Sequence, residues 1–473
     1  MNKIIGVALC LALFACSSAD KKDKQSNTSQ TTKDSVKTNP FENLEKGKIL
    51  ILKCKADTSN NYALYIPASY NSNKPSPVIY FFDAHAAGSL PLNKYKALSE
   101  KYGYLFAGSN NSKNGNTGEV NGAFASNMMN DLQARLNIDK ARIYTSGFSG
   151  GSRVAAGVAI FRGGVNTVIG IGAGLPNLEK QIENPFNYVG IAGNEDFNYN
   201  ELVDLEDMFS KSPIEHTFIS FNGKHEWCPV DIMNEAMMWL EFKAMKQSLI
   251  PKNDSLVNSF VTNMETKLNE LIKKKKEPEA LELAKRVISF TNGLTNTEKL
   301  NTTITQLEKS DAIKKDKERK LDLASAEKGL KEQYMNAMQS KDENWWRTEV
   351  AHMNDSKKFP ADQLAMNKRI LSYLSLACYM GITQMLKANQ IKEAEHFIIL
   401  YKTIDPTNPE APYLQATIYL TQNQDDKAIA ELKNAAKLGF KEYDRFTKDF
   451  QKYTTLVEVE KIAAEIQDNA KKE

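Results

Sequence analysis

Cysteine is scarce in this sequence, with five residues in a chain of 473. Cys-x-x-Cys pairs and clustered Cys/His spacings are missing and the five histidines are scattered, so a structural zinc site has no support. Glycine (24) and proline (15) are too few for a collagenous or low-complexity chain. A hydrophobic share of 41% with 25% charged residues also excludes a disordered or polytopic membrane protein. The sequence therefore predicts a folded protein, and it implies no metal or other cofactor.

An excess of charge of either sign is also lacking. Lys and Arg number 61 against 58 Asp and Glu, a net charge of +3, and no basic patch is interleaved with aromatic residues. Nucleic-acid binding consequently has no electrostatic support. The length is two to three times the roughly 150 residues of an average domain, so we expect at least two hydrophobic cores.

The N-terminal residues, 1–16, have the features of a signal peptide. A short basic start precedes an apolar run over residues 4–15, which is too short for a stable transmembrane helix. Residues 13–16 resemble the lipobox of bacterial lipoproteins, whose cysteine, here Cys16, becomes the lipid-bearing (palmitoylated) N-terminus. Because Ser17 rather than Asp follows, the resemblance implies an outer-membrane address in the bacterial cell envelope. The alternative is an ordinary secretory peptide that is cleaved nearby.

Residues 17–42 predict a flexible tether. Ser, Thr, Lys, Asp, Asn and Gln dominate this segment, and no aromatic residue occurs from residue 17 to residue 40, so no core can form. If Cys10 is removed with the signal and Cys16 is acylated, three cysteines remain, and we expect buried free thiols: Cys54, Cys228 and Cys378.

Two composition regimes divide the rest of the chain. Over residues 43–248, eight short apolar runs alternate with helical stretches such as residues 123–136. The later runs are continuously apolar, which predicts a doubly wound, mainly parallel α/β sheet covered on both faces. The predicted strands span residues 49–54, 62–66, 78–82, 105–108, 142–146, 167–172, 188–192 and 217–221. Over residues 249–473 strand signals stop, and Lys, Glu, Leu and Ala recur at helical spacing, so this part is predicted to be all-α.

A G-x-S-x-G pattern at residues 147–151 joins the strand 142–146 to a predicted helix at 152–160. Strand, pattern and helix in this order match the nucleophile elbow, in which the serine sits on a strained turn. The outer glycines, Gly147 and Gly151, are needed because Cβ atoms there would collide with the neighbouring strand and helix. Ser149 is therefore the candidate nucleophile. The alternative is a glycine turn with an incidental serine.

A nucleophilic serine needs a base, and that base needs an acid to orient it. Asp196 is the candidate acid, because it lies in the turn just after a predicted strand. Glu195, Asp204 and Asp207 are rivals, and a post-strand aspartate can also be a simple helix cap. His225, after the last strand, is the candidate base. His85 precedes the serine and would break the order serine, acid, histidine, and His216 comes before a predicted strand rather than after one. A plain surface-loop histidine is the alternative for His225.

Across residues 47–242 the chain resembles the α/β-hydrolase superfamily, most of all its carbohydrate-esterase, polyhydroxyalkanoate-depolymerase and dienelactone-hydrolase groups. The segments that carry the resemblance are residues 65–70, 77–82, the elbow, 193–196 and 223–227. By resemblance, the N–H of Gly150 and one N–H from the loop 83–88, nominated as that of Ala86, would form an oxyanion hole. This loop departs from the usual His-Gly pair, since Ala86 follows His85.

The helical half resembles tetratricopeptide repeats. Ala394 and Ala428 lie 34 residues apart, which is the period of these repeats, and the resemblance is clearest over residues 372–440. Such repeats usually present a surface to a partner protein, while the alternative is a scaffold that braces the other domain. Residues 277–284 are candidates for a further, degenerate repeat.

The favoured hypothesis is a membrane-tethered serine hydrolase, an esterase that works through an acyl-enzyme. The stretch 175–185 is too short for a lid, so the cleft is expected to be open to an ester- or acyl-bearing substrate, including one attached to a polymer. A serine peptidase is one alternative. A non-catalytic lipoprotein scaffold that works through its helical repeats is the other.

Overall fold

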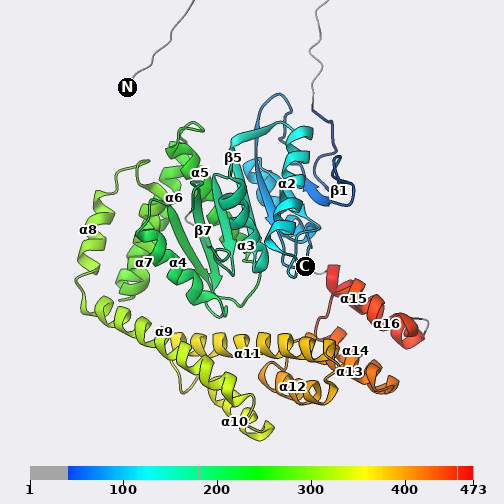
Figure 1. Cartoon of the computed structure of the whole chain (residues 1–473). Helices are drawn as coiled ribbons and strands as arrows, with labels where there is room; N and C mark the ends of the chain where they lie inside the picture. The colour runs from blue at the N-terminus through cyan, green and yellow to red at the C-terminus, as the bar shows by residue number, and fades with distance from the viewer. Residues whose placement is uncertain (1–40, 179–181, 455, 472–473) are drawn as a thin grey trace, which may run out of the picture. The chain divides into compact units, whose positions relative to one another are not determined.

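The computed structural model of the protein describes residues 41–178, 182–454 and 456–471, which form an eight-stranded sheet followed by helices (Figure 1). The strand order is β1-β2-β4-β3-β5-β6-β7-β8. β2 pairs antiparallel with β1 and β4, and all other neighbours in this sheet pair parallel. The strands are β1 (Ile49–Lys53), β2 (Asn61–Tyr65), β3 (Ser76–Phe82), β4 (Leu105–Ser109), β5 (Ile138–Phe148), β6 (Thr167–Ile171), β7 (Asn187–Gly193) and β8 (His216–Phe221). The predicted doubly wound, mainly parallel eight-stranded α/β sheet, followed by an all-α region, is confirmed.

Helices cover both faces of the sheet, as the continuously apolar strands require. Side chains of α1 and α5 pack on one face, and those of α2, α3 and α4 pack on the other. These helices are α1 (Ser89–Tyr102), α2 (Gly118–Arg135), α3 (Gly150–Gly157), which continues as a π-helical turn (Val158–Arg162), α4 (Tyr199–Ser210) and α5 (Val230–Lys246). α2 begins five residues before its predicted start, because the Thr117 side chain caps it by accepting a hydrogen bond from the N–H of Val120.

The chain from α6 onward is helical throughout its described elements. They are α6 (Asp254–Lys273), α7 (Glu277–Thr291), α8 (Glu298–Leu307), α9 (Asp311–Ala337), α10 (Glu343–Met353), α11 (Ala361–Lys387), α12 (Ile391–Ile404), α13 (Glu410–Thr421), α14 (Asp425–Lys437), α15 (Tyr443–Asp449), a 3₁₀ turn (Gln451–Tyr453) and α16 (Val457–Lys471). Apart from the first turn of α9, the helices from α9 on contribute to two apolar clusters of their own, separate from the clusters of the sheet.

Three pairs of consecutive helices in this region are connected by the same kind of turn. Lys275, Asn389 and Asn423 each have φ between 55° and 57° and connect α6 to α7, α11 to α12 and α13 to α14. The last two lie 34 residues apart, as do the fully buried Ala394 and Ala428. Small buried residues let the paired helices approach closely. The tetratricopeptide assignment itself stays a prediction.

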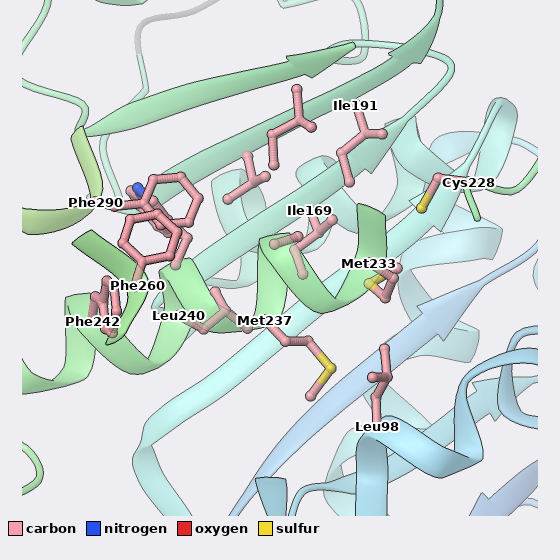
Figure 2. Close-up of a cluster of buried hydrophobic side chains, with 14 of the residues drawn as sticks. Leu98, Ile169, Ile191, Cys228, Met233, Met237, Leu240, Phe242, Phe260 and Phe290 are labelled. Carbon is pink, nitrogen blue, oxygen red and sulfur yellow. The ribbon is translucent and has the colours of Figure 1, made fainter. Parts of the chain in front are cut away.

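One apolar core joins the sheet to the first helices of the helical region. Met233, Met237 and Leu240 of α5 share it with Ile169 and Ile191 of the strands (Figure 2). All five side chains are fully buried, and each contributes on the order of 1.5–3 kcal/mol by leaving water.

The same core extends past α5 into α6, α7 and the start of α9. Phe242 of α5 meets Phe260 of α6 and Phe290 of α7, with ring centroids 5.3 and 6.3 Å away, and Phe260 stacks on Phe290 at 5.1 Å (Figure 2). The cluster reaches Ile313. The predicted domain boundary between residues 248 and 249 therefore separates residues that share a core.

The three remaining cysteines are free and buried, as expected. Burial raises the pKa of the thiols, to about 11 for Cys54 and to about 12 for Cys228 and Cys378, so at neutral pH they are protonated and unreactive. The predicted signal peptide, the lipidation site Cys16 and the tether lie outside the described residues, apart from the first residues after 40. Within the described part of the chain, no helix is both long and apolar enough to span a membrane.

Candidate active site

The elbow at the end of β5 holds Ser149 in a backbone conformation that few residues other than glycine adopt. Its φ is 55° and its ψ −123°, and α3 starts at the next residue. A Cβ atom on Gly147 would lie 2.1 Å from the carbonyl oxygen of Gly151, and one on Gly151 would lie 2.0 Å from that of Phe82. The steric reason inferred for the two outer glycines is confirmed: strand, turn and helix touch through their backbones.

The structure brings Ser149, His225 and Asp196 together. The Oγ atom of Ser149 lies 2.9 Å from Nε2 of His225, and Nδ1 of His225 lies 2.9 Å from both carboxylate oxygens of Asp196. Because an ionised carboxylate only accepts hydrogen bonds, Nδ1 carries the proton and Nε2 accepts from the Ser149 hydroxyl. Asp196 is buried, while the side chain of His225 is 18% exposed.

The rival carboxylates and histidines lie elsewhere. Glu195 pairs with Lys368 at 2.6 Å, and Asp207 pairs with Lys211 on the exposed face of α4. Asp204 is exposed on the same helix. Nδ1 of His216 hydrogen-bonds the Ile214 carbonyl, and His85 is an exposed side chain beside Asp83.

Asp196 is held by a short turn, residues 193–198, which we call the acid turn. The N–H of Asn198 donates to Asp196 Oδ1 at 2.8 Å. The acid turn is in direct contact with the loop that carries His225, since the N–H of Glu195 donates to the Gly223 carbonyl at 3.0 Å. A Cβ on Gly193 would lie 2.3 Å from that same oxygen, so the two loops meet without side chains between them. This contact sets the distance from Asp196 to His225.

Two aromatic rings restrict the imidazole of His225. The ring of Phe148 lies 4.6 Å from it and that of Phe197 lies 4.2 Å away, both between ring centroids. Phe148 comes from the elbow and Phe197 from the acid turn, so the residues next to the nucleophile and the acid also orient the base. Neither was predicted, although each directly neighbours a predicted site residue.

A buried aspartate that the sequence analysis missed organises the loop after β3. Asp83 Oδ1 accepts hydrogen bonds from the N–H groups of His85 and Ala87, and Oδ2 accepts one from the indole N–H of Trp227 at 2.9 Å. Asp83 thereby ties this loop to the His225 loop. A charged residue directly after the fully buried, mostly apolar β3 was the available signal.

The predicted oxyanion donors have different surroundings. Gly150 is the first residue of α3, so its N–H has no acceptor within the helix. Ala86 has φ 62°, and its N–H donates to the carbonyl of Asp83 at 3.3 Å, turned back into its own loop. The role of Ala86 as an oxyanion donor stays a prediction. That role requires that the hydrogen bond from its N–H to the Asp83 carbonyl be broken. Asn114 lies against Gly150, where an added Cβ would meet its Oδ1 at 1.8 Å.

Among the described residues, no group of three His, Cys, Asp or Glu side chains could hold a metal ion. The arrangement can transfer a proton from a serine hydroxyl to an imidazole whose other nitrogen faces a buried carboxylate.

Comparisons with known proteins give structural likeness only. No model of a known protein family matches the sequence. No curated protein matches it either. Among solved structures, S-formylglutathione hydrolase from Staphylococcus aureus is 13% identical, with a TM-score of 0.34, over 41% of this chain and 95% of that chain. A feruloyl esterase module from Clostridium thermocellum is 12% identical, with a TM-score of 0.34, over 42% and 88%. An esterase from Pyrobaculum calidifontis is 13% identical, with a TM-score of 0.33, over 43% and 85%. Likeness this distant carries no conclusion about activity.

Proposed function

We propose that the protein is a serine hydrolase, an esterase that works through an acyl-enzyme. Ser149 attacks the carbonyl carbon of an ester while His225 takes its proton, and the protonated imidazole then donates to the leaving alcohol. Water attacks the acyl-enzyme by the same route in reverse. Asp196 keeps the imidazole in the tautomer whose Nε2 can accept a proton.

One observation carries this proposal: the continuous series of hydrogen bonds from Ser149 through His225 to Asp196, each 2.9 Å long. Two features of the surroundings support it. Ser149 occupies a strained conformation, which an incidental serine has no reason to adopt. The N–H of Gly150, at the N-terminus of α3, is free within the helix to stabilise an oxyanion.

The test is reaction of the full-length chain with a fluorophosphonate probe, followed by mass spectrometry of the labelled peptide. Labelling should occur at Ser149 and should fall by at least about 10³-fold in Ser149→Ala. Asp196→Asn should lower the labelling rate by about 10⁴-fold, because the wrong tautomer is stabilised. Asp207→Asn is the matched control, since this exposed acid contacts only Lys211 among the interactions described above, and it should label like the wild type. Folded wild-type protein that resists the probe would refute the proposal.

If the probe labels the protein, the class of substrate is tested next. We propose that the substrate is an ester whose acyl group is carried by a larger molecule. The connection between β6 and β7 spans only residues 172–186, too short for a lid domain, and this supports an open cleft that would admit such a substrate. Hydrolysis of acetyl and feruloyl esters, with no cleavage of matched amides, would support this choice. Cleavage of the amides at comparable rates would favour the peptidase alternative.

We also propose that the enzyme is attached to the bacterial cell envelope, at the outer membrane, through lipid on Cys16. The lipobox-like residues 13–16 support this. Wild-type protein should incorporate radiolabelled palmitate and sediment with the envelope, whereas Cys16→Ser should do neither. Equal incorporation by both proteins would contradict the proposal.

Partner docking through the helical repeats is proposed as a second role of the chain. An open groove of about 660 Å³ supports it, lined by α10, α12, α13 and α14 residues that include Arg347, Ile399, Lys402 and Glu431. A photocrosslinking residue at position 399 should capture one specific protein in cells. The same residue at Leu321, exposed on α9, is the control. Equal capture at both positions would exclude the groove as a docking site.

A further inference from the structure

Four side chains of α9 and α11 contact the acid turn and the residue two positions after it. Arg369 donates from Nη1 to the Asn194 carbonyl at 2.9 Å, and Lys331 donates to the Phe197 carbonyl at 3.3 Å. Lys368 pairs with Glu195, and the amide of Asn200 donates to Glu327. Asp196 thus lies between two backbone carbonyls that are both bound by cations of the helical region.

Arg369 is itself fixed by a buried carboxylate. Its Nε and Nη2 atoms lie 2.9 and 2.6 Å from Oε2 of Glu327, which is 1% exposed, while Arg369 is 7% exposed. Lys331 also pairs with Glu327, at 2.9 Å. Burial tends to raise the pKa of Glu327, but Arg369 and Lys331 outweigh it and hold the pKa below its usual value. The carboxylate is therefore charged, and the guanidinium on it has one orientation.

The contact from Glu327 through Arg369 to Asn194 differs from an ordinary ion pair between two parts of a protein. A guanidinium is planar and presents its donors in a rigid fork, so binding Glu327 on one edge fixes where Nη1 points. Nη1 points at the backbone two residues before Asp196. The ring of Tyr199, just after the acid turn, lies 5.1 Å from the guanidinium carbon and closes a further side. Movement of Arg369 would therefore move the turn that carries Asp196.

We propose that Arg369, oriented by Glu327, is a positioning residue of the hydrolase: it acts through the Asn194 carbonyl to keep Asp196 in register with His225. The α9–α11 pair is then part of the active site and not a separate module. This inference rests on the proposed function. A carboxylate displaced by about 1 Å orients the imidazole poorly, and misplacement of this size costs on the order of 10²-fold in rate.

The test compares Arg369→Gln and Arg369→Lys with a matched control on the same two helices. Arg319 of α9 binds Asp362 of α11, with Nη2 and Oδ1 2.7 Å apart; both side chains are exposed, and their ion pair involves no residue of the acid turn. Arg319→Met thus removes an arginine–aspartate contact between α9 and α11 and leaves the acid turn alone. All variants are made in the full-length chain, and thermal unfolding is recorded for each.

The first readout is hydrolysis of p-nitrophenyl acetate together with the rate of fluorophosphonate labelling. In Arg369→Gln we expect kcat and the labelling rate to fall by about 10- to 100-fold, with KM changed by less than about twofold. Arg369→Lys should recover part of the loss, because an ammonium can reach either Glu327 or Asn194 but not both in the same geometry. Arg319→Met should match the wild type. Equal losses in Arg319→Met and Arg369→Gln, or a loss that only follows the unfolded fraction, would overturn the proposal.

The second readout does not depend on catalysis. The proton on Nδ1 of His225, shared with Asp196, should give a low-field proton NMR signal, which is assigned by its disappearance in His225→Gln. This signal should shift or broaden in Arg369→Gln and stay in place in Arg319→Met; an unchanged signal in Arg369→Gln would overturn the positioning role. If wild-type protein resists the probe while the signal responds to Arg369→Gln, the proposed reaction fails and the positioning role stands.

Discussion

Two junctions between the helical region and the sheet, both made by described residues, use different chemistry. At the first, α6 and α7 extend the apolar core of α5 and the strands through Phe242, Phe260 and Phe290. At the second, α9 and α11 reach the acid turn through Arg369 and Lys331, both held by Glu327. We call these the apolar junction and the ionic junction.

The two junctions show how the helical region can contribute both to the stability of the fold and to the position of Asp196. Burial of apolar surface is strong but non-directional, so the apolar junction holds the parts together without specifying any atom's position. Hydrogen bonds to a buried charged pair are directional, and a buried pair contributes little net stability. The ionic junction lies beside Asp196, where direction matters, and the apolar junction lies away from it.

Breaking the apolar junction should have the largest effect on stability. Phe260→Ala removes a ring that is 7% exposed and stacked on Phe290, so the free energy of unfolding should fall by about 3–5 kcal/mol in urea denaturation. The labelling rate per folded molecule should not change. Ile272→Ala on the same helix, at a side chain that is 39% exposed, is the control and should cost far less. A large loss of labelling in folded Phe260→Ala would erase the distinction between the junctions.

Removing one partner of the ionic junction should also destabilise strongly, whereas removing both should not. Glu327→Leu leaves Arg369 buried without its carboxylate, which we expect to cost about 3–5 kcal/mol. Glu327→Leu combined with Arg369→Met should return to within about 1–2 kcal/mol of the wild type. The buried guanidinium is removed together with its carboxylate, and among charged groups only Lys331, whose side chain is 20% exposed, loses its partner. Urea denaturation measures both. Labelling at Ser149 should stay slow in the double variant; recovery of the rate along with stability would mean that the pair has no positioning role.

Acidification should weaken the ionic junction specifically. The folded-state pKa of Glu327 lies below its ordinary value of 4.5, so the unfolded chain takes up a proton at a higher pH than the folded one does. The stabilisation is fully present above about pH 4.5 and is lost as the pH falls through the folded-state pKa. The stability difference between wild type and the Glu327→Leu, Arg369→Met double variant should change in this window, in favour of the double variant. An identical acid dependence of the two proteins would contradict this.

The smallest effect is expected at the outer edge of the ionic junction. Lys368, with a side chain 38% exposed, pairs with Glu195 at 2.6 Å. Lys368→Gln should change the free energy of unfolding by less than about 1 kcal/mol, and high salt should reduce that difference further. Urea denaturation at low and high salt tests it. A salt-independent loss of several kcal/mol would show that this pair belongs with the buried one.

Much of the fold was predictable because its signals are local. All eight strands appear where short apolar runs predicted them, and their ends shift by only a few residues, most at β5, which begins at Ile138. Ser149 was predictable for the same reason. Gly147 and Gly151 must be glycines because a Cβ atom at either position would collide with the backbone of the same turn or of Phe82. Asp196 and His225 followed from their places after strands, because parallel strands end at one edge of the sheet.

Other parts could not be predicted, because they depend on which distant side chains meet. Nothing in the sequence shows which of Arg369 and Arg319 binds a buried carboxylate, although an apolar run follows Arg369 and charged residues surround Arg319. Only packing places one on a buried carboxylate and the other on the surface. No pattern along the sequence therefore indicates the ionic junction.

The sequence by itself determined the class of fold, the elbow and the order of the candidate site residues, since these depend on apolar periodicity and on steric limits between near neighbours. The tertiary structure alone decided that the N–H of Ala86 turns back to Asp83, and that α9 and α11 reach the acid turn. Arg369 and Asn194 are 175 residues apart, and only the completed packing of the helices on the sheet brings them within 2.9 Å. Contacts of this kind leave no periodic trace in a sequence, because the energy of a charged side chain depends on what finally surrounds it.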